Sequence, residues 1–143
     1  MEDRPGRQPP SATALTSLNG FRVLLVEDTW IIAQSYAGLL EPLGVTIVGP
    51  AATAADALRL LADTSVHLAL VDLNLQGEMA YDLIDVLVGR EVPVPVVVVT
   101  GYESLPALEA RTVAILKKPI KAELLLRALR GVAAARSETA AMG

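Results

Sequence analysis

The sequence contains no cysteine, and His67 is its only histidine. Without cysteine the chain has no disulfide framework, no thiolate zinc site and no cysteine nucleophile. A single histidine excludes a multi-histidine metal site and disfavours a catalytic triad built around histidine. Chemistry in this chain must therefore be sought among carboxylates, hydroxyls, amides and lysines, which suit hard cations better than soft ones.

The chain also lacks an excess of positive charge and a long hydrophobic run. Its net charge is −4, which argues against nucleic acid as a partner. The mean hydropathy of +0.47 would suit a membrane protein. However, the longest apolar run, around Val92–Val99, has about eight residues, whereas a membrane-spanning helix needs ~20. The N-terminus has no apolar signal core. We therefore predict a soluble cytoplasmic protein with neither a membrane nor a nucleic-acid partner.

What is present is the composition of one globular domain. The chain has 143 residues, of which 52% are hydrophobic and 20% charged, and this is enough for a domain with a real core. Residues 1–19 contain Pro, Gly, Ser and Arg without periodicity, which predicts a flexible leader. Residues 136–143 are expected to form a flexible tail. The predicted domain therefore spans residues 20–135.

Within this domain, short apolar runs alternate with segments of helical periodicity. The runs that predict strands are Val23–Val26, Thr46–Val48, Leu68–Val71, Val96–Val99 and Val113–Leu116. Because these runs show no polar alternation, they predict a five-stranded parallel sheet with helices on both faces, a doubly wound α/β fold. Thr53, with Asp56 three residues later, is typical of a helix start. The fourth helix must be short or irregular, near Pro106–Ala110, because little chain is available there.

Polar residues follow four of the five predicted strands, at the point where each strand ends. They are Glu27-Asp28, Asp72 with Asn74, Thr100-Gly101, and Lys117-Lys118-Pro119. In an open α/β sheet, ligands bind at the carboxyl ends of the strands, so these side chains are expected to meet. Three carboxylates at one edge repel each other unless cations compensate. Lys118 supplies one positive charge, and Mg²⁺ or Mn²⁺, which prefer oxygen ligands, would supply two more.

Such a set of groups can accept a phosphoryl group. The metal and the lysine would neutralise the incoming oxygens, while the Thr100 hydroxyl and the Gly101 amide would donate hydrogen bonds to them. Asp72 is then the predicted nucleophile, and an aspartyl phosphate is the product.

These residues, in this order, resemble the receiver domain of two-component response regulators. The elements that carry the resemblance are VLLVED (23–28), LVDLNL (70–75), VVTGY (98–102) and LKKP (116–119). The resemblance covers roughly residues 21–134. It implies a CheY-like, flavodoxin-like sheet with strand order 2-1-3-4-5, and a role in phosphorelay signalling.

The resemblance implies a role for each acidic residue. Asp72 would accept phosphate from a histidine kinase or a histidine phosphotransfer protein. Asp28 and Asp72 would bind Mg²⁺ through their carboxylates, and Glu27 would hold a metal-bound water. Asn74 would bind the metal through its backbone carbonyl and would border the phosphoryl group.

The other site residues would respond to the phosphoryl group. Lys118 would pair with it, and the bond from Lys118 to Pro119 would be cis. Thr100 would move toward the phosphate and pull the following loop with it, while Gly101 fits a preference for a small residue beside the site.

Two features concern the switch and the subgroup. Ile115 stands where many receivers have Tyr or Phe, and Tyr102, which adjoins Thr100, is a candidate to replace that aromatic switch. The TGY and VGPA segments (100–102 and 48–51) also resemble single-domain regulators with a Phe-Ala-Thr-Gly signature, although Val98-Val99 replaces Phe-Ala here. That subgroup is associated with general stress signalling.

The leading hypothesis is a phosphorylation-switched docking module for a protein partner, rather than an enzyme with a separate substrate, and homodimerisation is left open. A non-phosphorylated scaffold is an alternative. A phosphatase of the haloacid dehalogenase type is disfavoured because its nucleophile would follow the first strand, and the general acid that it needs is missing. A flavin-binding protein is disfavoured because EDTW (27–30) places two carboxylates where a phosphate-binding loop is needed.

Overall fold

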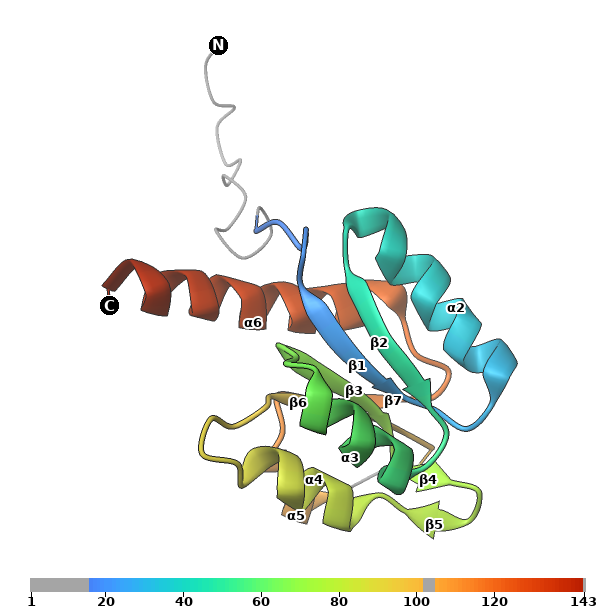
Figure 1. Ribbon diagram of the computed structural model, residues 1–143. Coiled ribbons are helices and arrows are strands. Elements are labelled where there is room, and N and C mark those ends of the chain that lie inside the picture. The colour runs from blue at the N-terminus through green and yellow to red at the C-terminus, as the bar shows by residue number, and fades with distance from the viewer. Residues whose placement is uncertain (1–15, 102–104, 143) are drawn as a thin grey trace.

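The centre of the protein is a five-stranded parallel sheet with the order β2-β1-β3-β6-β7. The computed structural model describes residues 16–101 and 105–142 (Figure 1). The strands are β1 (Arg22–Val26), β2 (Thr46–Ala51), β3 (Leu68–Asp72), β6 (Val96–Thr100) and β7 (Ala114–Lys117). Numbered along the chain, these strands follow the order 2-1-3-4-5, so the predicted doubly wound fold is confirmed.

Helices cover both faces of the sheet (Figure 1). One face carries α2 (Trp30–Leu40), which a 3₁₀ turn η1 (Glu41–Leu43) extends, and α6 (Ala122–Met142). The other face carries α3 (Ala54–Asp63), α4 (Tyr81–Val88) and α5 (Pro106–Glu109). The fourth predicted helix is α5, and its four residues confirm that it is short. None of the described helices combines the length and the apolar character that crossing a bilayer requires.

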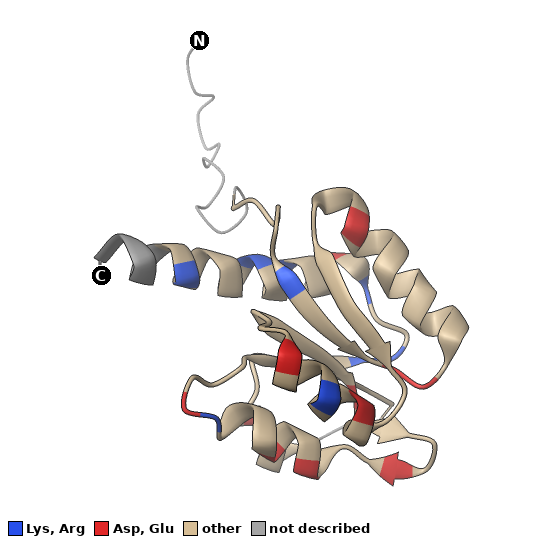
Figure 2. Ribbon diagram, in the orientation of Figure 1, with Lys and Arg blue, Asp and Glu red and all other residues tan. Residues whose placement is uncertain are grey.

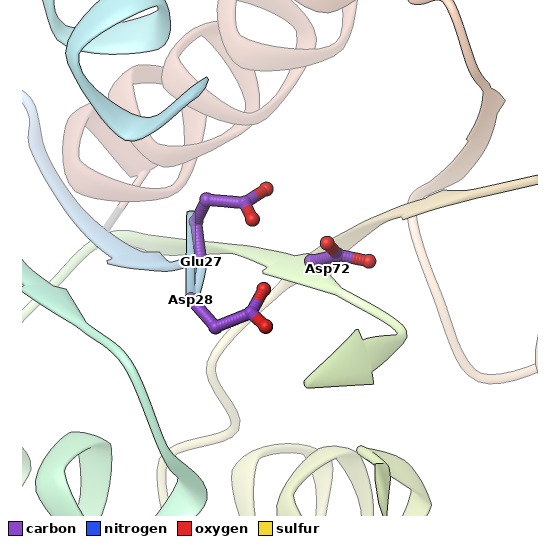
Figure 3. A group of neighbouring side chains, drawn as sticks. All are labelled: Glu27, Asp28 and Asp72. Atoms are coloured by element: carbon purple, nitrogen blue, oxygen red, sulfur yellow. The ribbon is translucent and has the colours of Figure 1, made fainter. Parts of the chain in front are cut away.

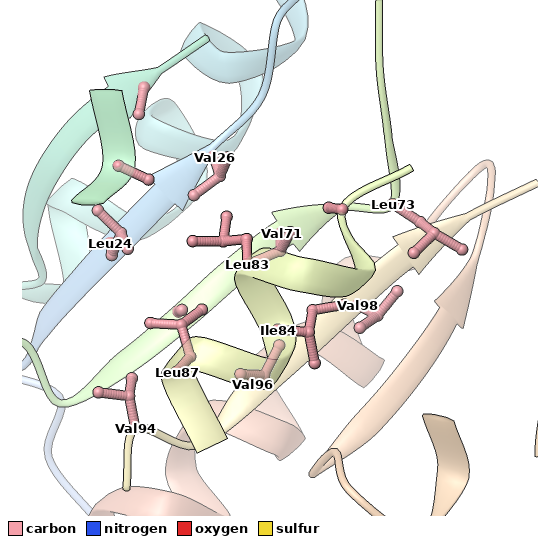
Figure 4. Packing of buried hydrophobic residues seen from close by; sticks show 14 of the residues in the cluster. Leu24, Val26, Val71, Leu73, Leu83, Ile84, Leu87, Val94, Val96 and Val98 are labelled. Atoms are coloured by element: carbon pink, nitrogen blue, oxygen red, sulfur yellow. The ribbon is translucent and has the colours of Figure 1, made fainter. Parts of the chain in front are cut away.

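Two hydrophobic clusters hold the layers together, one on each face of the sheet. The strands contribute to both clusters, because successive residues of a strand point to opposite faces of the sheet. In β1, Leu24 and Val26 pack with α3 and α4, while Val23 and Leu25 pack with α2 and α6. Figure 4 shows the first cluster, in which Ile84 of α4 lies over the strands. The apolar runs of the sequence are thus explained by burial on both sides.

The structure describes chain on both sides of the predicted domain of residues 20–135. Residues 1–15 of the predicted leader lie outside the described residues, but Leu18 is buried in the cluster beneath α2 and α6. The amide of Phe21 donates a hydrogen bond to the Leu18 carbonyl at 3.0 Å. At the other end, α6 continues to Met142 instead of stopping before a tail at residue 136. Residues 136–142 include two alanines and no glycine or proline, so nothing in their sequence stops the helix.

A small hairpin after β3 was not predicted. Its strands β4 (Asn74–Leu75) and β5 (Glu78–Met79) pair antiparallel. The turn residues Gln76 and Gly77 both have positive φ angles, of 54° and 87°, as in a type I′ turn. These strands are too short to show the alternation by which strands are recognised in a sequence.

The predicted cap of α3 is confirmed, and it provides a test of local stability. The Thr53 hydroxyl accepts a hydrogen bond from the Asp56 amide at 3.1 Å. Thr53→Ala is expected to lower the free energy of unfolding by about 1 kcal/mol, because the amide loses its partner. Urea denaturation measures this loss. Thr53→Ser keeps the hydroxyl and should retain most of the stability, and equal losses in both variants would contradict the capping role.

Candidate functional site

The carboxyl ends of β1, β3, β6 and β7 meet at one edge of the sheet, and Asp72 lies between them. Its Oδ2 atom is 3.0 Å from Lys118 Nζ, and its Oδ1 atom accepts a hydrogen bond from the Asn74 amide at 3.1 Å. Asp72 is only 4% exposed, whereas the Lys118 side chain is 38% exposed. The structure therefore holds the predicted nucleophile at the end of β3, with a cation on one side and a backbone donor on the other.

Glu27, Asp28 and Asp72 form an acidic cluster in which one carboxylate oxygen of each lies within 4.8 Å of the others (Figure 3). The parallel pairing of β1 with β3 explains this proximity, because Val26 is aligned with Val71 and these residues immediately precede Glu27 and Asp72. These three acidic residues were predicted from the sequence as one site, and the fold brings them together.

Glu27 is the most deeply buried member of the acidic cluster. Its Oε2 atom accepts a hydrogen bond from the Thr29 amide at 3.1 Å, and its Oε1 atom is buried without a partner among the described residues. Burial raises the pKa of Glu27 to about 7; the Thr29 hydrogen bond opposes this rise and the charge of Asp72 adds to it. A buried carboxylate oxygen without a partner, beside two further carboxylates, fits a hard divalent cation such as Mg²⁺.

Thr100 and Gly101 end β6 on the same edge. Thr100 is 2% exposed, and its carbonyl accepts a hydrogen bond from the Lys118 amide at 2.8 Å, which ties the ends of β6 and β7 together. Gly101 is exposed, and a Cβ atom added there would meet no atom within 4 Å. The backbone at Gly101, which follows the strand beside β3, thus faces open space.

The remaining predicted residues fall in three different places. The Lys118–Pro119 peptide bond is cis. Ile115 is half-buried and packs against the cluster of α3 and α4. Tyr102, the candidate replacement for the aromatic switch, lies outside the described residues. The identity of the switch residue therefore stays a prediction.

Two contributors to the site were not predicted. The Gln76 amide donates a hydrogen bond to Asp28 Oδ2 at 2.9 Å, and the only sequence signal for it is Gly77, a frequent hairpin-turn residue. Tyr36 of α2 is buried, and burial together with the charges of Glu27 and Asp72 raises its pKa to about 12. Tyr36 belongs to the buried face of α2, and that face carries the ring toward the acidic cluster.

His67 has a structural role away from this edge. It precedes β3, and its Nδ1 atom accepts a hydrogen bond from the Arg22 amide at 2.9 Å. Its ring stacks on Phe21 with the centroids 5.2 Å apart. Burial, followed by the charges of Arg136 and Arg22, lowers the pKa of His67, which favours the neutral form that accepts this bond.

Comparison with known proteins agrees with the geometry. The profile of the response regulator receiver domain matches residues 23–130, which include all the candidate site residues. The chain therefore belongs to the response regulator receiver domain family. Receiver domains act in two-component signalling as switch modules rather than enzymes, they interact with histidine kinases, and the acidic triad is typical of their Mg²⁺ site. No curated protein matches the chain.

Solved structures show the same fold. The receiver domain of an HD domain-containing protein from Pseudomonas fluorescens is 28% identical with a TM-score of 0.70, over 80% of this chain and 94% of that chain. A CheY-like receiver domain from Methylobacillus flagellatus is 24% identical with a TM-score of 0.71, over 80% and 99%. A mutant of the anti-anti-sigma factor PhyR from Bartonella quintana is 22% identical with a TM-score of 0.67, over 84% and 50%. This chain thus spans about half the length of PhyR.

Proposed function

We propose that Asp72 accepts a phosphoryl group from a phosphohistidine donor in a reaction that requires Mg²⁺, and that this event switches a docking surface for a protein partner. The observation that carries the proposal is the setting of Asp72, a buried carboxylate 3.0 Å from Lys118 Nζ and within 4.8 Å of the other two carboxylates of the acidic cluster. In the transfer, the bond from phosphorus to the histidine nitrogen breaks as a bond to an Asp72 oxygen forms.

The residues present would hold the cation as follows. The carboxylates of Asp28 and Asp72 and the backbone carbonyl of Asn74 would bind it, and Glu27 would hold one of its waters. When bound, Mg²⁺ or Mn²⁺ would neutralise negative charge on the phosphoryl oxygens. A cation here also offsets the repulsion among carboxylates that burial makes costly at Glu27.

The other residues of the site would bind the phosphoryl group and report its presence. Lys118 would exchange its contact with Asp72 for one with a phosphoryl oxygen. The Thr100 hydroxyl and the Gly101 amide would donate hydrogen bonds, and Thr100 would draw the segment that follows it toward the site. Because α5 has only four residues, we expect this change to be a shift between two nearby arrangements rather than refolding.

The phosphate donor and the partner are each proposed as a class of protein. The donor would be a histidine kinase or a histidine phosphotransfer protein. The TGY and VGPA segments favour membership of the Phe-Ala-Thr-Gly signature subgroup, and the structural likeness to PhyR concerns its fold. The partner would then be a protein of a phosphorelay.

Intact mass tests the proposal. After incubation with Mg²⁺ and acetyl phosphate, the wild-type protein is expected to gain one phosphoryl group, and Asp72→Asn is expected to gain none. Asp82→Asn, which changes an exposed aspartate in the first turn of α4, is the matched control and should be phosphorylated like the wild type. If beryllofluoride, a phosphoryl mimic, also leaves the fluorescence of Trp30 unchanged, the absence of a mass gain would identify a scaffold instead.

A further inference from the structure

We propose that the β4–β5 hairpin is a positioning element for the metal site, and that the backbone amide of Gln76 sets the orientation of the Asp28 carboxylate. The inference rests on the proposed function, because it concerns residues that would hold the cation. Its basis is the 2.9 Å hydrogen bond from the Gln76 amide to Asp28 Oδ2, between residues 48 positions apart in the chain.

Two backbone amides of the hairpin, one at the start of β4 and one in the turn that follows it, contact two carboxylates of the acidic cluster. The Asn74 amide donates to Asp72 Oδ1 at 3.1 Å, and the Gln76 amide donates to Asp28 Oδ2 at 2.9 Å. Amides two positions apart in an extended segment point in the same direction. One stretch of backbone therefore spans the carboxylate from β3 and the carboxylate from β1, and it helps to set the distance between them.

The hairpin is built to keep this shape. The Gly77 amide donates to Asn74 Oδ1 at 2.8 Å, across the turn, and the Ala80 amide donates to the Leu73 carbonyl at 2.7 Å, at the base. Leu75 is buried and joins the cluster of α3 and α4. Because side chain and backbone both anchor the hairpin, the Gln76 amide is held in place before a cation binds.

The role belongs to the backbone of Gln76 rather than to its side chain, and this decides the choice of variants. Gln76 has φ of 54°, which glycine adopts without strain and proline cannot adopt. Gln76→Gly keeps the amide and is the matched control. Gln76→Pro removes the donor and also disturbs the turn. Replacement of residue 76 by an α-hydroxy acid turns the amide into an ester and removes the donor alone.

Mg²⁺ titration of the full chain, followed by the fluorescence of Trp30, measures the effect. Trp30 is the only tryptophan and lies two residues after Asp28. The proline and ester variants are expected to bind Mg²⁺ about tenfold more weakly, as is usual when a group that orients a metal ligand is lost. Gln76→Gly should bind like the wild type. Urea denaturation in EDTA shows whether each variant is folded.

Hydrogen exchange gives a second readout that does not depend on the metal. Without Mg²⁺, the Gln76 amide is expected to exchange more slowly in the wild type than in Asp28→Ala, because its acceptor is lost in the variant. Equal exchange rates, or equal Mg²⁺ affinity in a folded ester variant and the wild type, would overturn the positioning role while leaving the proposed function intact. A wild type that binds no Mg²⁺ would instead overturn the proposed function, and this inference with it.

Discussion

Lys118→Ala is expected to destabilise the metal-free protein by about 1 to 3 kcal/mol at pH 8, because it removes the ammonium group that offsets the negative charge of the acidic cluster. Removing one partner of a fully buried ion pair costs about 3 to 5 kcal/mol. The loss here should be smaller, because the Lys118 side chain is 38% exposed and water screens its charge. Urea denaturation in EDTA measures the change in the free energy of unfolding.

Two further conditions separate this charge effect from lost packing. Mg²⁺ should restore much of the stability, because it also neutralises the acidic cluster, and lowering the pH to 5 should reduce the loss, because a protonated carboxyl needs no counter-ion. Lys121→Ala, at an exposed lysine three residues further on, is the control and should be nearly neutral. If the loss of stability at pH 5, and the loss in Mg²⁺, both equal the loss at pH 8 in EDTA, the effect of Lys118 comes from its aliphatic chain and not from its charge.

Glu27→Gln is expected to remove a pH dependence from the stability of the metal-free protein. The pKa of Glu27 is raised from its ordinary 4.5 to about 7, first by burial, so the folded protein binds this proton more tightly than the unfolded chain does. The stabilisation is therefore complete below about pH 4.5 and is lost as the pH rises through about 7. One pKa unit corresponds to about 1.4 kcal/mol, which makes the whole loss about 3 kcal/mol.

The substitution should flatten this part of the stability profile and make the variant more stable than the wild type at pH 8 in EDTA. The glutamine carbonyl can still accept from the Thr29 amide, and its NH₂ group can donate to a neighbouring carboxylate. Urea unfolding measured from pH 4 to 8 tests this, with Glu41→Gln as the control at an exposed glutamate of η1. If wild type and Glu27→Gln have parallel profiles, the titrating group is not Glu27.

Charge on the surface did not enter the site prediction, and the structure shows how it is distributed. Figure 2 shows acidic residues along α3, α4 and β5, while α6 carries basic positions such as Arg127 and Arg130. Arg111 forms an ion pair with Asp85, which ties the residues after α5 to α4. Such pairing joins segments that are distant in the chain, so the sequence alone offers no sign of it.

Two features that depend on near neighbours in the chain, a buried strand and a helix start, were predicted correctly. The valines of β6 predicted a buried strand, and Thr53 with Asp56 predicted the start of α3, because each signal depends on residues within a few positions. The gathering of Asp28, Asp72 and Lys118 also followed from sequence, because parallel strands place their carboxyl ends at one edge. The burial of Leu18 could not be predicted, since no periodic pattern marks an isolated apolar residue.

The sequence by itself determined the five strands of the sheet, the helices that alternate with them, and which polar groups lie at the carboxyl edge of the sheet, because these follow from periodicity and from the parallel topology. Only the tertiary structure decided how those groups are held. The Gln76 amide reaches Asp28 because β1 and β3 are paired in one register, with Val26 beside Val71. That register depends on contacts between distant residues, which short-range patterns do not encode. The hairpin is local, but its strands are too short to show a periodic pattern.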